Sequence, residues 1–217
     1  MINDNLALTG ALTIAINNEV VQETNNLVVT SGKEWVAKRM AGQDSNMTHM
    51  AIGTGTTTAA AAQTALTTEL ERNALTVSGG TVSTNTIVYA ATYAAGDGTG
   101  AITEAGIFDT VGSKVDDITI TVGGSGYASA PSVTFSAPTS GTTATGTAVL
   151  TGGVVTSITI TNVGSGYTAA PTITIDGAAT ATATMKEGGD MLARTKFDVV
   201  NKGAADSMTI TWTITVS

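Results

Sequence analysis

Hydrophobic and polar positions alternate in several short stretches of the chain, most clearly at the C-terminal end. In residues 208–216 every second side chain is apolar, and the side chains between them are threonines. This period of two predicts a strand with one face in a core. Similar patterns predict strands at residues 11–17, 24–30 and 84–93. The threonine face of the last strand suggests that it lies at a sheet edge, where its unpaired backbone groups could pair with a strand of another molecule.

One short helix is predicted at residues 32–40. Ser31 and Glu34 have the spacing of a capping box, and Gly42 suits the position after a helix C-terminus. A second helical turn is possible within residues 64–72. The apolar stripe of the helix would consist of Trp35, Val36 and Met40.

Glu104 disturbs the strand predicted at residues 101–110. On a strict period of two it shares a face with Ile102 and Phe108. Either Gly106 marks a β-bulge that changes the phase, or Glu104 lies at a subunit interface or against a basic partner. The glycine favours the bulge.

The middle of the chain repeats itself. GSGYASAPSVTF at residues 124–135 returns as GSGYTAAPTITI at residues 164–175. Each copy contains a strand, a glycine-rich turn, a tyrosine, a proline and a second strand, and the two strands of a copy are short enough to pair as a hairpin. A second hairpin would turn at Gly152-Gly153. A single copy has too few strands to be stable, so we expect the two copies to pack together.

Tyr127 and Tyr167 occupy the same point in the two copies, and they are the candidate binding residues of the repeat. Exposed tyrosines can stack on sugars. Their equivalent positions favour packing beside the proline, with the hydroxyl hydrogen-bonded at a strand end.

The repeat reads as an insertion. Without residues 114–187, the strands on either side are joined by a glycine-rich turn and form an ordinary hairpin. The sequence therefore predicts an all-β protein. Its host domain, residues 1–113 and 188–217, would be a β-sandwich or jelly-roll-like fold with one or two short helices. Residues 114–187 would form a small inserted β domain made of two 40-residue repeats.

Composition excludes several classes of function. The net charge is −8 with only 9 lysines and arginines, which disfavours nucleic acid and an anionic membrane surface as partners. There is no cysteine, so thiol catalysis and cysteine-bound metals are excluded. We see neither a signal peptide nor a membrane-spanning run.

No constellation of catalytic residues stands out. His49 is the single histidine and has no metal-binding partners nearby in the sequence. The GTGTTT run at residues 53–58 lacks the Gly-Lys-Ser/Thr ending of a phosphate-binding loop. We therefore predict no catalytic residue, no cofactor, no metal and no enzymatic activity.

Several host segments resemble virion structural proteins of tailed bacteriophages. These segments are MAIGTGTT (50–57), TALTTELER (64–72), ITEAGIFD (102–109), MLARTKF (191–197) and VNKGAADSMTITWTITVS (200–217). The GSGYxxAPxxTI repeat is similar to modules inserted in phage tail and capsid proteins. The resemblance implies a particle component, assembled in the bacterial cytoplasm and located in the virion, and it implies no enzymatic residue.

Among particle locations, the length of the chain leaves no room for a long fibre shaft, which favours capsid decoration. We expect a cement protein that docks on the major capsid protein through its host domain, displays the insert outward and forms a homotrimer. A tail, neck, baseplate or fibre component is the alternative. A carbohydrate-binding module, which would take host-surface glycans through the insert, is a second alternative.

Overall fold

The computed structural model describes residues 7–42, 46–110, 112–138, 141–186 and 188–217. Antiparallel strands make up most of this part of the chain, and it contains a single helix, which confirms the all-β prediction. The chain divides into two compact units. The larger unit is Met1–Thr110 with Gly189–Ser217, and the smaller unit is Val111–Gly188. The boundaries predicted from the repeat, 113/114 and 187/188, lie within a few residues of this division.

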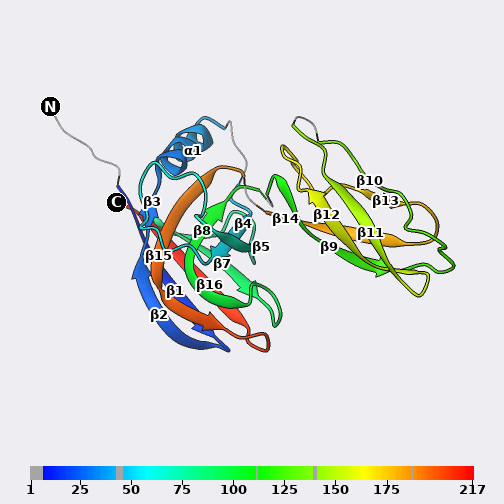
Figure 1. Cartoon of the computed structure of the whole chain (residues 1–217). Coiled ribbons are helices and arrows are strands. Elements are labelled where there is room, and N and C mark those ends of the chain that lie inside the picture. Colours follow the sequence, from blue (N-terminus) through cyan, green and yellow to red (C-terminus); the bar gives the residue numbers. More distant parts are fainter. Residues whose placement is uncertain (1–6, 43–45, 111, 139–140, 187) are drawn as a thin grey trace. The chain divides into compact units, whose positions relative to one another are not determined.

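The larger unit contains two five-stranded sheets and the helix (Figure 1). The first sheet has the order β2 (Glu19–Asn25), β1 (Leu8–Ile16), β16 (Met208–Val216), β7 (Thr86–Tyr93), β6 (Thr81–Ser83). The second sheet has the order β3 (Leu27–Val28), β15 (Met191–Lys202), β8 (Gly100–Phe108), β4 (His49–Gly53), β5 (Glu69–Ala74). Both sheets contribute to one buried apolar cluster, so the unit is a β-sandwich.

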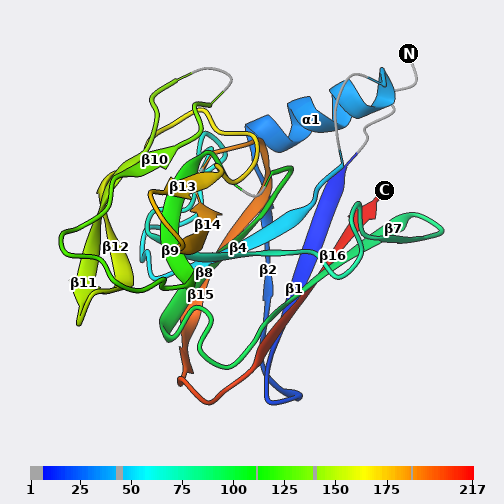
Figure 2. The same ribbon diagram turned by 90° about the vertical axis from the view of Figure 1, so that its right-hand side faces the viewer.

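Strand β16 is central, not an edge. It lies between β1 and β7 (Figure 2), and Trp212 is opposite Leu12 on one side and Tyr89 on the other. All three side chains are buried in the core. The apolar face predicted for this strand is therefore confirmed, whereas the exposed threonine edge is wrong because both neighbours pair with it along most of its length.

Strand β2 was not predicted from the sequence. Asn17 and Asn18 connect β1 to β2 with φ values of 50° and 69°. Two positive φ angles in a two-residue turn match the twist of a hairpin, and asparagine accepts them more readily than most residues. The strand predicted at residues 24–30 is divided at Asn26, where the chain passes from the first sheet to the second.

Helix α1 runs from Thr30 to Met40 and lies across one end of the sandwich in both views (Figures 1 and 2). The capping box is wrong, because the Ser31 hydroxyl donates to the carbonyl of Met191 at 2.9 Å instead of capping the helix. Gly42 ends the helix as predicted, with φ of 68° and its N–H 3.0 Å from the carbonyl of Arg39. Met40 is 79% exposed and does not join the stripe. The helical turn considered at residues 64–72 is absent, since β5 begins at Glu69.

The smaller unit has six strands in three pairs, β9 with β14, β10 with β13 and β11 with β12. Their bounds are β9 (Lys114–Val122), β10 (Val133–Phe135), β11 (Thr145–Thr151), β12 (Val154–Asn162), β13 (Ile173–Ile175), β14 (Thr180–Lys186). The turn between β11 and β12 at Gly152-Gly153 is confirmed, with φ values of 61° and 76°.

The hairpin predicted within each copy is wrong, because the copies exchange strands. The short strand of one copy, β10, pairs with that of the other, β13. The first strand of each copy pairs with a strand that follows the other copy's proline turn: β9 with β14, and β12 with β11. One apolar core joins both copies. Each copy therefore completes the other.

Backbone hydrogen bonds show the internal symmetry of this exchange. The N–H of Val115 donates to Val163 at 2.9 Å, and the N–H of Val155 donates to Gly123 at 2.9 Å, so the same bond occurs in both directions 40 residues apart. The smaller unit consequently has an approximate two-fold relation between its repeats.

Candidate functional site

The two repeat tyrosines are packing residues in this structure. The Tyr167 side chain is 4% exposed; its hydroxyl accepts from the N–H of Ala144 at 2.8 Å and donates to the carbonyl of Ser136 at 3.2 Å. The hydroxyl of Tyr127, which is partly buried, accepts from the N–H of Ala179 at 3.0 Å. Each tyrosine therefore holds the backbone just before a strand that follows the other copy: Ala144 precedes β11, and Ala179 precedes β14. Neither presents a free ring face and hydroxyl together, as sugar stacking would require.

Glu104 is fully buried in an ion pair with Arg194, which is also fully buried. Its carboxylate accepts three backbone N–H groups, those of Gly55 at 3.0 Å, Thr67 at 3.0 Å and Thr68 at 2.8 Å. Burial without these partners would be very costly for a carboxylate. The pair therefore fastens the segment 54–68 to β8 and β15.

Of the three sequence explanations of Glu104, the bulge at Gly106 and the subunit interface are wrong, and the basic partner is confirmed. Gly106 pairs regularly with Ala51 and with Arg194, so it marks no bulge. Strand β15 itself shifts register against β8 twice, between Met191 and Ala193 and between Lys196 and Val200, and the second shift lies beside Glu104. A subunit interface is also wrong for this side chain, because it has no exposed area. Its basic partner belongs to the same chain, at Arg194.

A second buried ion pair lies next to His49. Arg72 donates to both carboxylate oxygens of Glu69, at 2.8 and 2.7 Å, and its guanidinium lies 3.8 Å from the centre of the Phe108 ring. Burial, and then the charge of Arg72, lower the pKa of His49 from 6.5 to about 4. The Thr48 hydroxyl lies 2.8 Å from Nδ1 of His49 and donates to the carbonyl of Asp109. Each of these polar groups has a partner within the fold, as structural residues do.

Within the described residues, no group of three or more histidines or acidic residues could hold a metal ion. Helix α1 is too short and too polar to cross a membrane, and it is the only helix described.

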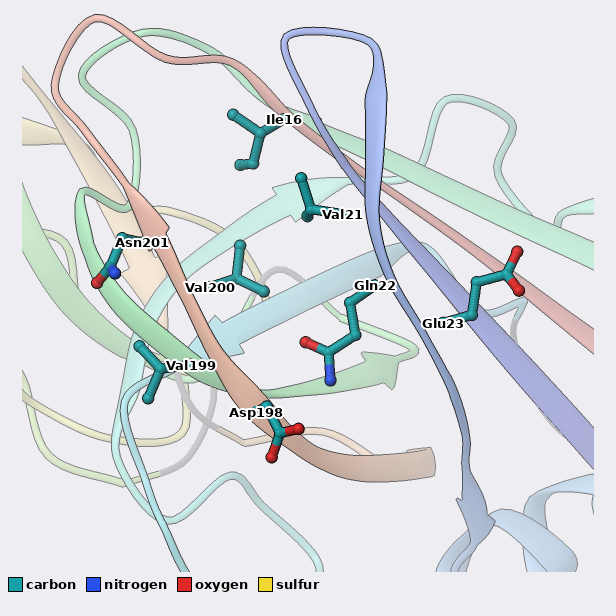
Figure 3. Close-up of a pocket in the computed structure, with 8 residues that line it drawn as sticks. All are labelled: Ile16, Val21, Gln22, Glu23, Asp198, Val199, Val200 and Asn201. Atoms are coloured by element: carbon teal, nitrogen blue, oxygen red, sulfur yellow. The ribbon is translucent and has the colours of Figure 1, made fainter.

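The larger unit has a groove between β2 and β15, which we call the edge groove (Figure 3). It has a volume of about 540 Å³ and is lined by Ile16, residues 21–23 of β2 and residues 198–201 of β15. Strand β2 is the outermost strand of its sheet. Three valines are strongly exposed here or next to it: Val20 at 61%, Val21 at 52% and Val199 at 58%.

Side chains, not backbone pairing, connect the two walls of the edge groove. The side-chain amide of Gln22 lies 3.0 Å from both the N–H and the carbonyl of Asp198, in the orientation that satisfies both groups. Figure 3 shows Gln22 directed toward the strand that carries Asp198. The hydroxyl of Thr195 donates to the carbonyl of Asn25 at 2.8 Å. The sandwich therefore stays open along this side.

A second, more apolar groove of about 390 Å³ lies between α1 and the first sheet. Its walls include Trp35, Met40, Val82 and Tyr89. Nothing in the structure indicates what covers it, so we assign it no role.

The sequence predicted the strand after the insertion, where β15 lies, but it predicted neither β2 nor the edge groove. The turn at Asn17-Asn18, between two runs of strand-forming residues, is the signal from which β2 and its exposed valines follow. The bulge in β15 has no comparable signal in the sequence.

Comparisons with protein-family models, with curated proteins and with solved structures return no match for this chain.

Proposed function

We propose that this chain is a non-enzymatic structural protein of a tailed-bacteriophage virion. In this proposal it is a capsid decoration or cement protein that attaches to the major capsid protein through its larger unit. The five host segments that resemble phage virion proteins belong to the larger unit, where they supply most of β4, β5, β8, β15 and β16.

The edge groove is the observation that carries the proposal. Isolated exposed valines are ordinary, but two on the edge strand β2 and a third on β15 across the groove form the kind of surface that proteins cover with a partner. The rest of the larger unit provides a stiff support, because both sheets are antiparallel and share one core. Such a surface suits attachment, and it requires no chemical reaction.

Glycan binding by the smaller unit receives no support from the two tyrosines. Tyr167 is almost completely buried, and the hydroxyls of both tyrosines already bind backbone groups. The proposal therefore gives the smaller unit no glycan ligand.

The proposal includes self-association as a homotrimer. Charged residues make up only 12% of the chain, which is low for a protein whose whole surface faces water. A three-fold assembly would match points where three capsid subunits meet. Strand β16 is central in its sheet and offers no free edge for this association.

Reconstitution on particles tests this function. We expect the purified chain to sediment as a trimer, to bind heads of its own phage that lack it, and to raise the temperature at which those heads open, since a ligand of the assembled shell stabilises it. Detached tails, added at the same protein concentration, serve as the control. Binding to tails and not to heads would replace the capsid assignment with a tail one, and binding to neither would refute the virion proposal.

A further inference from the structure

We infer that the edge groove binds an extended, lysine- or arginine-bearing segment of another protein, which adds a strand to the free edge of β2. This inference deepens the proposed function and rests on it for the source of the segment. The chemistry that selects the segment is read from the groove itself.

The backbone of β2 has groups directed into the groove. The carbonyl of Asn25 accepts from Thr195 on β15, while the N–H of the next residue, Asn26, donates to Gly10 on the opposite side at 3.1 Å. Backbone groups alternate in direction along an antiparallel strand. The N–H and carbonyl of Glu23, two residues before Asn25, therefore also face away from β1. No backbone hydrogen bond within the described residues occupies the groove side of Glu23.

The opposite wall already binds an amide. The Gln22 side chain places one N–H donor and one carbonyl acceptor against the backbone of Asp198. A peptide group offers the same pair of atoms. The Gln22 side chain therefore spans the gap between the two walls. A further strand would make the same kind of hydrogen bonds with its main chain, as strands do when they add to open sheet edges in other proteins.

Charge selects the kind of segment. Glu23 and Asp198 line the groove, and Glu19 lies on the same strand. None of the eight described residues that line it carries a positive charge. Lys196 is on β15 but does not belong to the lining. Exposed valines beside carboxylates match a strand in which apolar and basic side chains alternate.

A second copy of β2 is a poorer occupant. Antiparallel pairing of two β2 strands about Val21 would place Glu19 opposite Glu23 twice, and like charges directly opposite each other destabilise a sheet. Such pairing also has two-fold symmetry, which does not produce a trimer.

The test uses the full chain and two peptides, Ac-KVKVKVK-NH2 and its acidic counterpart Ac-EVEVEVE-NH2. We expect the basic peptide to bind saturably and more weakly as salt is added, and to slow hydrogen exchange at the N–H of Glu23. Glu23→Lys should weaken binding of the basic peptide about 2- to 30-fold. One cross-strand charge pair contributes about 0.2–1 kcal/mol, and the substitution counts this twice because an attraction is lost and a repulsion is added. Glu34→Lys, the same change on the exposed face of α1, should leave binding unaltered.

Several outcomes overturn the inference: no binding of the basic peptide, equal binding of the acidic one, or no protection at Glu23. Dimerisation of the free chain that the basic peptide reverses would assign the groove to a second copy. The same Glu23→Lys and Glu34→Lys variants on phage heads separate the two proposals. If the heads bind both variants equally, the groove is not the attachment site, but the proposed function stands. If the chain binds the basic peptide but no heads, the groove inference stands and the proposed function is refuted.

Discussion

The substitution Arg194→Met removes one partner of the buried ion pair and leaves the Glu104 carboxylate without its counter-charge. Both side chains have no exposed area, so water cannot replace the lost partner. Breaking a buried pair in this way costs about 3–5 kcal/mol. A domain is stable by only about 5–15 kcal/mol, so the loss is a large part of the total. At about 3 °C per kcal/mol for a chain of this size, the transition of the larger unit should fall by about 9–15 °C.

The same substitution also releases the segment 54–68. Arg194 donates to Gln63 at 2.7 Å, and to the carbonyl of Thr57 and the hydroxyl of Thr67 at 3.0 Å each. Amide hydrogen exchange should therefore accelerate at Gly55, Thr67 and Thr68, which bind the carboxylate. Adding Glu104→Gln should restore part of the stability, because the neutral amide carries no buried charge and its oxygen still accepts from Gly55 and Thr68, although the N–H of Thr67 loses its acceptor.

Lys38→Met is the control. Lys38 and Asp190 lie 2.9 Å apart but are roughly half exposed, and such surface pairs contribute about 0–1 kcal/mol. Urea unfolding of the three variants and the parent chain gives the comparison. If Arg194→Met costs no more than Lys38→Met, or if Glu104→Gln adds to the damage, the pair does not fasten segment 54–68 and the reasoning fails.

Three further predictions concern titration, the repeat and the insertion. The pKa of His49 is about 4 in the folded chain and 6.5 in the unfolded chain, so between these pH values the unfolded chain binds one more proton. Stability to urea should therefore fall as the pH drops from 6.5 to 4, and it should fall less steeply in His49→Gln; equal slopes would contradict this. Tyr167→Phe should lower the free energy of unfolding by about 1–3 kcal/mol, because the buried N–H of Ala144 loses its acceptor, and Tyr127→Phe should lower it less because that residue is less buried. The reverse order of the two variants in thermal unfolding would count against the packing role. Replacing residues 111–188 by a short Gly-Ser turn should leave one cooperative unfolding transition, since the N–H of Asp190 already donates to the Asp109 carboxylate at 2.8 Å. A non-cooperative product would refute independent folding of the larger unit.

Local patterns predicted the elements that the chain specifies locally. Alternation over residues 208–216 identified β16 and its buried face, and the 40-residue repeat with the hairpin it interrupts identified the insertion. The helix end at Gly42 and the turn at Gly152-Gly153 could be predicted because these positions need positive φ angles, which glycine readily adopts.

Pairings between distant segments did not follow from local patterns. The two copies of the repeat have nearly the same sequence, so pairing within a copy and pairing between copies satisfy the same pattern, and only the shared core of the smaller unit favours exchange. Glu104 and Arg194 are 90 positions apart, and a period-two pattern says nothing about which distant side chain meets a buried acid. The centrality of β16 likewise depends on β1, which joins it from the other end of the chain.

The edge groove was least predictable. It needs β2, whose turn was missed, and the irregular stretch of β15 between Lys196 and Val200, where a strand-like sequence departs from regular pairing with β8.

Attachment to phage heads through the larger unit can be measured with shortened chains. The larger unit closed by a Gly-Ser turn in place of residues 111–188, and residues 111–188 alone, would each be cosedimented with phage heads that lack the protein. We expect the closed larger unit to bind the heads with the affinity of the full chain, and the smaller unit not to bind. Binding by residues 111–188 alone, with none by the folded larger unit, would contradict this expectation.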